Sequence, residues 1–269
     1  MRTGNKLTLN RAQTSIRTQV ASTEIYARAM CRPERREPVI VLIHGLGVSS
    51  RYMVPVAQRL FPSFDVYAPD LPGFGKSGKP DHVFDISELA ATLVTWMDRL
   101  DLTRVVALGN SFGCQVIAEM ATLHPQRLER SILVGPTTDP HARTTPNQAG
   151  RLLRDIPWEP LSLLPLNLRD YVACGPARLW QTYRHALADP IEDKLPHMDL
   201  PTLVVRGDHD PIVSQRWAEE AAALLPLGSL EVVPGAGHAV NYNSPAPLSA
   251  LVTAFVAGAG DPERPLPPP

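Results

Sequence analysis

The sequence predicts an α/β fold in which helices cover both faces of a mostly parallel sheet. Two kinds of segment alternate along its 269 residues: short, β-branched apolar runs and longer stretches with helical periodicity. Most of the runs are almost continuously apolar, as expected of strands that are buried on both faces. A chain of this length can bury the core of one large domain.

Eight segments are candidate strands. Two early segments, near Lys6–Leu9 and Thr23–Arg28, are expected to form an antiparallel opening pair. Six further runs are expected to form the parallel part of the sheet: Val39–Ile43, Asp65–Ala68, Val105–Leu108, Ser131–Val134, Thr202–Val205 and Leu230–Val233. Helical spacing of apolar residues predicts five helices between the runs: Arg51–Leu60, Ile86–Leu100, Phe112–Leu123, Gln215–Leu225 and Pro247–Val256.

The alternation stops between about residues 137 and 199. This stretch has prolines and short helical pieces, such as Leu161–Tyr171 and Ala177–Leu187, but no convincing strand. It is too apolar for a disordered linker, so we expect a helical insertion over the sheet, where a lid would lie; helices that only extend the core are the alternative. The expected domains are a core of residues 1–136 and 200–260, a helical cap of residues 137–199 and a proline-rich disordered tail of residues 261–269.

Composition argues against several classes of protein. The formal net charge of −1 gives no bulk attraction to nucleic acid or to an anionic membrane. No apolar run reaches the ~18 residues of a membrane span, and no signal peptide is expected. The cysteines Cys31, Cys114 and Cys174 match neither a disulfide framework nor a zinc pattern. We expect a cytoplasmic protein with a small-molecule substrate and without a nucleic-acid or membrane partner. The oligomeric state is left open.

Ser111 lies between two glycines where a strand must turn sharply into a helix. Gly109-Asn-Ser-Phe-Gly113 matches G-x-S-x-G in the strand-to-helix context that a nucleophile elbow requires. Small residues two positions before and after the serine avoid a clash in the tight turn. The following helix directs its positive end toward the serine. We therefore predict that Ser111 is a nucleophile.

A serine hydroxyl needs a base, and the base needs an orienting carboxylate. His238 follows a strand and a Pro/Gly loop late in the chain and is the predicted base. Asp210, three residues after Gly207 and followed by proline, is the predicted orienting residue. Asp208 is the alternative, although we expect it to form a hydrogen bond within its turn. The cluster of Asp208, His209 and Asp210 has no further ligand at metal spacing, so we expect no metal site.

An oxyanion hole would complete the site. Its predicted donors are the backbone N–H groups of Leu46, within His44-Gly-Leu-Gly47, and of Phe112. Removing a donor of this kind typically costs ~10²–10³ in rate. His44 follows a strand within a turn motif, and we expect it to be structural and not a base.

These motifs together resemble the α/β-hydrolase fold superfamily, of the cofactor-free serine-nucleophile type with a helical cap. The resemblance rests on five stretches: His44–Gly47, Asp70–Gly78, Gly109–Gly113, Gly207–Pro211 and Gly235–His238. The chain order Ser, Asp, His is also that of the superfamily. The resemblance implies an eight-stranded sheet flanked by helices, with an inserted cap. Cys114 departs from the pattern, since many relatives carry glycine there, as does the lack of an acidic residue before Pro245.

The resemblance implies hydrolysis of an ester or other acyl bond in a small or medium apolar molecule. One alternative is carbon–carbon bond hydrolysis, as in the meta-cleavage product hydrolases, whose dienoate carboxylate would need basic groups such as Arg143, Arg151 or Arg178. Cofactor-free haloperoxidase-like activity and a ligand-binding receptor are further alternatives, although the intact Ser, His and Asp set argues against a receptor. Three aromatic residues of the cap are candidates for lining an apolar pocket: Trp158, Trp180 and Tyr183.

Overall fold

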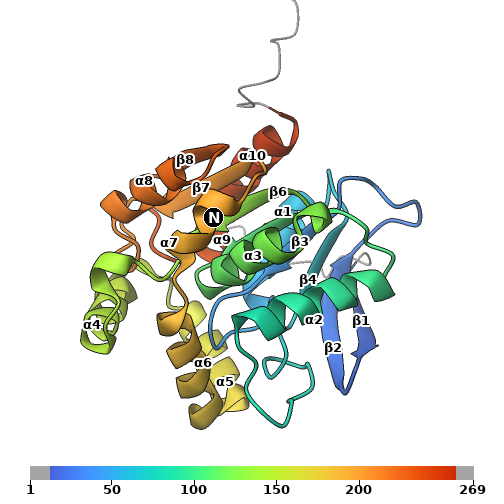
Figure 1. Cartoon of the computed structure of the whole chain (residues 1–269), viewed down its shortest axis with the longest axis horizontal. Coiled ribbons are helices and arrows are strands. Elements are labelled where there is room, and N and C mark those ends of the chain that lie inside the picture. Colours follow the sequence, from blue (N-terminus) through green and yellow to red (C-terminus); the bar gives the residue numbers. More distant parts are fainter. Residues whose placement is uncertain (1–12, 259–269) are drawn as a thin grey trace, which may run out of the picture.

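The computed structural model describes residues 13–258, which form an eight-stranded sheet with helices on both faces (Figure 1). The strands are β1 (Gln13–Val20), β2 (Thr23–Met30), β3 (Ile40–Ile43), β4 (Val66–Pro69), β5 (Val105–Asn110), β6 (Leu128–Val134), β7 (Thr202–Gly207) and β8 (Gly228–Val233). Their order across the sheet is β1-β2-β4-β3-β5-β6-β7-β8. The pairs β1–β2 and β2–β4 are antiparallel and the other pairs are parallel, which confirms a mostly parallel sheet.

The antiparallel opening pair is present, but β2 has a different partner from the one predicted. The segment Lys6–Leu9 lies outside the described residues, and β2 pairs along its length with Gln13–Val20. This strand is at the edge of the sheet, and most of its side chains are polar and exposed. Because an edge strand pairs on one side and faces water, it lacks the apolar run by which the central strands were recognised.

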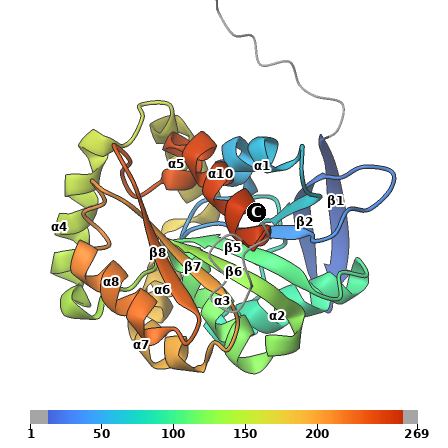
Figure 2. The ribbon, with the colours of Figure 1, turned by 90° about the horizontal axis from the view of Figure 1, so that it is seen from above.

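Helices cover both faces of the sheet. Those flanking the strands are α1 (Val54–Leu60), α2 (Ile86–Arg99), α3 (Phe112–Leu123), α8 (Gln215–Leu224), α9 (Val240–Asn243) and α10 (Pro245–Val256), and a 3₁₀ turn, η1 (Ser50–Met53), precedes α1. The helices α2, α3 and α8 pack into one apolar core, while α1 and α10 pack into the other. Figure 2 shows these two groups on opposite sides of the sheet. The five predicted helices are therefore present.

Within the described residues, the chain between β6 and β7 is helical and contains no strand. Its elements are η3 (Pro140–Ala142), α4 (Thr145–Asp155), η4 (Ile156–Trp158), α5 (Leu163–Cys174), α6 (Pro176–Ala188), α7 (Ile191–Lys194) and η5 (Leu195–His197). The helices α4, η4, α5 and α6, here called the inserted helices, lie on one side of the molecule (Figure 1). By contrast, α7 and η5 place buried Ile191 and Leu195 in the core that contains α3. The division into core and cap stays a prediction.

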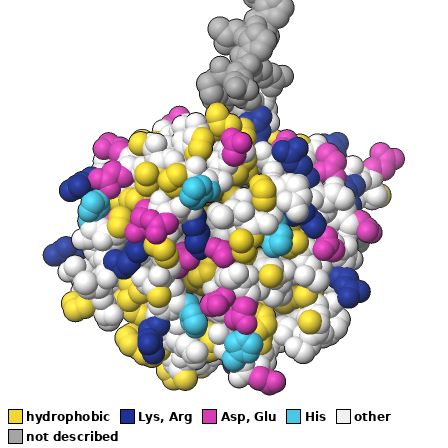
Figure 3. All heavy atoms as spheres, viewed as in Figure 1, with side chains coloured by type: hydrophobic (Ala, Val, Ile, Leu, Met, Phe, Trp, Pro, Cys, Tyr) yellow, Lys and Arg dark blue, Asp and Glu magenta, His cyan; other side chains and the backbone are white. Residues whose placement is uncertain are grey.

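Charged side chains of both signs are interspersed on the face of the molecule seen in Figure 3. This matches the near-balance of acidic and basic residues in the sequence. No helix within residues 13–258 has both the length and the apolar character needed to cross a bilayer.

Candidate active site

Ser111 lies in a strained turn between β5 and α3. Its φ of 55° and ψ of −119° fall in a region that residues other than glycine rarely adopt. Two glycines provide the room: a Cβ on Gly109 would lie 2.6 Å from the carbonyl carbon of Gly113, and one on Gly113 would lie 2.4 Å from the carbonyl oxygen of Ile43. The N–H of Ser111 donates to the carbonyl of Val134 at 2.9 Å, which joins the turn to β6.

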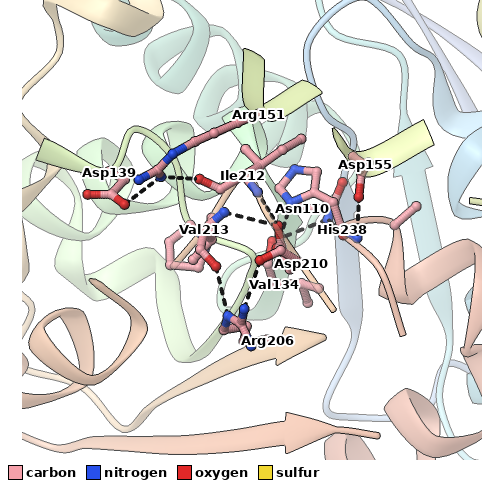
Figure 4. Close-up of polar contacts among 12 residues, drawn as sticks. Asn110, Val134, Asp139, Arg151, Asp155, Arg206, Asp210, Ile212, Val213 and His238 are labelled. Atoms are coloured by element: carbon pink, nitrogen blue, oxygen red, sulfur yellow. Dashed lines mark hydrogen bonds and ion pairs between the residues drawn. The ribbon is translucent and has the colours of Figure 1, made fainter. Parts of the chain in front are cut away.

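His238 and Asp210 form a buried pair beyond the carboxyl ends of β8 and β7 (Figure 4). Nδ1 of His238 lies 2.8 Å from Oδ2 of Asp210. Oδ1 of Asp210 accepts the N–H groups of Ile212 and Val213 at 2.8 and 2.9 Å. The guanidinium of Arg206 donates to the carbonyl of Asp210 at 2.7 Å. These bonds fix the carboxylate and orient the imidazole, which is the arrangement that a catalytic base requires.

Asp208, the alternative to Asp210, points elsewhere. It is 38% exposed, and its Oδ1 lies 2.8 Å from Nδ1 of His209. The backbone N–H of Gly235 lowers the pKa of the Asp208 carboxyl, as expected for an aspartate that forms hydrogen bonds within a turn. The structure therefore brings Asp210, and not Asp208, to His238.

The other ring nitrogen of His238, Nε2, is buried and has no hydrogen-bond partner within the described residues. His238 and Ser111 line the same cavity, but no hydrogen bond joins their side chains. In free enzymes such bonds are often long and tighten when the substrate binds. Burial lowers the pKa of His238, but the nearby carboxylates of Asp210, Asp155 and Glu159 raise it to about 9.

The two predicted oxyanion donors line this cavity as well. Phe112 is the first residue of α3, so its N–H has no acceptor within the helix. The N–H of Leu46 donates to no backbone carbonyl within residues 13–258. Both groups are thus free to bind a substrate oxygen; their role stays a prediction.

His44 is structural by its contacts. Its Nδ1 donates to the carbonyl of Gly45 at 2.8 Å, and its Nε2 accepts the N–H of Leu71 at 2.9 Å. Burial lowers the pKa of this histidine, and both of its nitrogens are occupied. It cannot serve as a base without losing one of these bonds.

The cavity has a volume of about 450 Å³ and lies between the strand ends and the inserted helices. Its apolar wall on the insertion side includes Leu152, Ile156, Leu161, Leu164, Trp180 and Tyr183. Trp158, a third aromatic candidate, is instead stacked on His209, with ring centroids 3.9 Å apart. An apolar substrate of moderate size suits such a cavity.

The three arginines considered for a dienoate carboxylate do not line the cavity. Arg143 pairs with Glu192, and Arg151 donates to Asp139 and to the carbonyl of Ile212. Arg178 donates to the carbonyl of Pro80 at 2.8 Å. The charged residues that do line the cavity, apart from His238, are the acidic Asp155 and Glu159.

Sequence reasoning missed four residues around the predicted base. Asn110 donates through its side-chain amide to the carbonyl of His238 at 3.2 Å, and Gly135 leaves room for the imidazole. Asp155 and Glu159 accept backbone N–H groups of the His238 loop. Gly135 carried a signal, because it directly follows an apolar strand. The two acids carried none, since their partners are some 80 positions away.

Cys114, the unexplained departure in the elbow, is buried behind the turn. Its Sγ lies 3.3 Å from the carbonyl oxygen of Gly109, and burial raises the pKa of its thiol well above the usual value. A buried thiol of this kind is unreactive. Among the described residues, no three His, Cys, Asp or Glu side chains gather as metal ligands would.

Residues 40–251 match the sequence model of the alpha/beta hydrolase family, and the chain belongs to this family of enzymes. It is 28% identical over 242 residues to "Putative carbamate hydrolase RutD" of Pseudomonas savastanoi pv. phaseolicola, with 81% of this chain and 93% of the relative covered. It is 27% identical over 253 residues to "Putative non-heme chloroperoxidase" of Synechocystis sp., with 81% and 90% covered. The enol-lactonase from Burkholderia xenovorans LB400 shares the fold, with a TM-score of 0.77, 22% identity and coverage of 90% of this chain and 100% of that chain.

Proposed function

We propose that the protein is a serine hydrolase that cleaves carboxylic ester or other acyl bonds in small or medium apolar molecules. One observation carries the proposal. His238, which is paired with buried Asp210, lines the same cavity as Ser111, which is held in a strained turn. Strain of this kind persists only where the surrounding structure maintains it, and it clusters at functional sites.

The proposed reaction has two halves, acylation of Ser111 by the substrate and hydrolysis of the acyl-enzyme. His238 Nε2 takes the hydroxyl proton of Ser111 as Ser111 Oγ attacks the substrate carbonyl carbon. The N–H groups of Leu46 and Phe112 hold the resulting oxyanion. The carbon–oxygen bond then breaks, and the imidazolium gives its proton to the leaving alcohol. Water that is deprotonated by His238 hydrolyses the acyl-enzyme, which releases the acid and restores Ser111.

Asp210 keeps the imidazole in the correct orientation and stabilises its charged form in both steps. Its own carboxylate is held by two backbone N–H groups, so it does not have to reorganise during the reaction. In this proposal the inserted helices make up most of the cap, residues 137–199, that covers the substrate. A cytoplasmic location remains part of the proposal.

The lining of the cavity favours neutral substrates over anionic ones. Two carboxylates and no arginine or lysine line it, so a dienoate carboxylate would meet two acidic groups and His238 as the one basic side chain of the lining. We therefore rank carbon–carbon bond hydrolysis below ester hydrolysis. The relatives' names add support of different kinds: an enol-lactone is itself an ester, whereas the chloroperoxidase name favours haloperoxidase-like activity as a second candidate.

A substrate panel tests the proposal. We expect turnover of short p-nitrophenyl esters, none of a yellow dienoate, and loss of the ester activity in Ser111→Ala. Consumption of the dienoate alone would make the protein a carbon–carbon bond hydrolase. Bromination of an indicator dye with peroxide, without ester turnover, would favour the haloperoxidase. Binding of ligands without any turnover would make it a receptor.

A further inference from the structure

Two acidic residues of the inserted helices hold the loop that carries His238. Asp155, at the end of α4, accepts the backbone N–H of His238 at 3.2 Å (Figure 4). Glu159 accepts the backbone N–H of Ala239 at 2.7 Å and the side-chain amide of Asn243 at 3.2 Å. Asp155 is 6% exposed. Two consecutive backbone N–H groups of the loop thus donate to carboxylates from another part of the chain.

The same short segment also contacts the loop that carries Asp210. The ring of Trp158 is stacked on that of His209, with an interplanar angle of 17°. The segment also packs closely against Gly237, next to His238. A Cβ on Gly237 would lie 2.9 Å from Oε1 of Glu159 and 3.0 Å from Cβ of Trp158, so this close packing depends on the glycine. Residues 155–159 therefore bridge the two loops that supply the predicted base and its carboxylate.

These carboxylates also act on the charge of the imidazole. The acidic groups that face His238 are Asp210 from the β7 loop, with Asp155 and Glu159 from the insertion; the cation Arg206 donates to the carbonyl of Asp210. Burial raises the pKa of Glu159 to about 7 and that of Asp155 above its usual value. When ionised, both stabilise the imidazolium, which is the form that His238 takes after it accepts the proton of Ser111.

We propose that Asp155 and Glu159 are positioning residues, which fix the His238 loop through its backbone and stabilise the imidazolium. This inference deepens the proposed function and rests on it. Residues 155–159 thus add to the hold that Asp210 and Asn110 already have on His238. The position of the base is thereby coupled to the wall of the cavity, because Asp155 and Glu159 both line the cavity and hold the loop.

Hydrogen exchange in the resting protein tests the structural half without any substrate. In Glu159→Ala the amide of Ala239 loses its acceptor, and in Asp155→Ala the amide of His238 does, so exchange of the peptide spanning 236–243 should become faster. Asp193→Asn, an exposed acid of α7, is the control and should leave exchange unchanged. Unchanged exchange in both alanine variants would overturn the proposal, whatever the protein hydrolyses.

The pH dependence of kcat/KM tests the electrostatic half. Glu159→Gln keeps an oxygen acceptor but removes the charge, so the acid limb should move to lower pH by roughly 0.5–1 unit. Glu159→Ala should lower kcat roughly tenfold, because a buried donor loses its acceptor, with a smaller change in KM. Asp193→Asn should keep the parent profile. An unshifted limb in Glu159→Gln would overturn this half, whereas an inactive parent protein would instead refute the proposed function.

Discussion

Gly135 and His238 touch at a position where no other residue fits. Gly135 follows β6 with a positive φ of 56°, and a Cβ on it would lie 2.9 Å from Cε1 and 3.0 Å from Nδ1 of His238. The same Cβ would lie 3.2 Å from Oδ2 of Asp210. The buried pair therefore depends on a glycine that belongs to a neighbouring strand end.

We expect Gly135→Ala to displace His238 and to lower kcat, and to destabilise the protein by about 1–2 kcal/mol through its positive φ alone. Steady-state kinetics and urea unfolding measure the two effects. Gly150→Ala is the matched control, because Gly150 lies within α4 and a Cβ there meets nothing within 4 Å. That variant should be as stable as the parent or up to ~1 kcal/mol more stable. Equal kinetics for Gly135→Ala and the parent would contradict the claim that the His238 ring requires a glycine at position 135.

Asp210→Asn and Asp208→Asn form a second matched pair. The first removes the carboxylate that orients and stabilises His238, so kcat/KM should fall on the order of 10³–10⁴-fold. The second changes an exposed turn residue and should stay within a few-fold of the parent. Kinetics on a short ester measure both. The reverse ranking would show that Asp208 orients the base.

The stability of the fold should respond to the protonation of His238. Burial lowers its pKa, but the surrounding carboxylates raise it to about 9, above the unfolded value of 6.5. A raised pKa contributes stability that is present below pH 6.5 and is lost as the pH rises through about 9. The free energy of unfolding, measured with urea, should be higher for the parent than for His238→Gln at pH 6.5. This difference should shrink between pH 6.5 and 9. A difference that grows with pH over this range would show that burial dominates instead.

The thiol of Cys114 should resist modification. It is buried and its pKa is raised, so an alkylating reagent at pH 8 should modify it only as fast as the protein unfolds. Half-buried Cys31 serves as the internal comparison and should react sooner. Mass spectrometry of peptides measures both rates. Rapid alkylation of Cys114 with parallel loss of activity would mean that the thiol is accessible from the cavity.

Much of the fold could be predicted from the sequence, because the buried residues of central strands and amphipathic helices form apolar patterns within each element. The parallel strands and the helix Phe112–Leu123 were identified in this way. The edge strand Gln13–Val20 was not, since its burial is slight and its residues are polar. Within the insertion, α4 was missed because most of its side chains are polar or exposed.

The site divides in the same way. Ser111, Asp210 and His238 stand beside glycines or prolines that shape their own turns, so a local pattern identified them. Asp155 and Glu159 act on backbone groups brought near only by folding, and such contacts leave no local pattern. The structure places Ser111 and His238 around one cavity, with Asp210 bonded to His238; their catalytic roles stay predictions until they are measured.

The role of Ser111 is the central claim, and covalent labelling with a fluorophosphonate tests it most directly. The folded protein should gain one phosphonyl group, located on the peptide that contains Ser111. Ser111→Ala should gain none, and Asp208→Asn should be labelled as fast as the parent. Absence of labelling in the folded parent protein, or an adduct that persists in Ser111→Ala, would contradict the account.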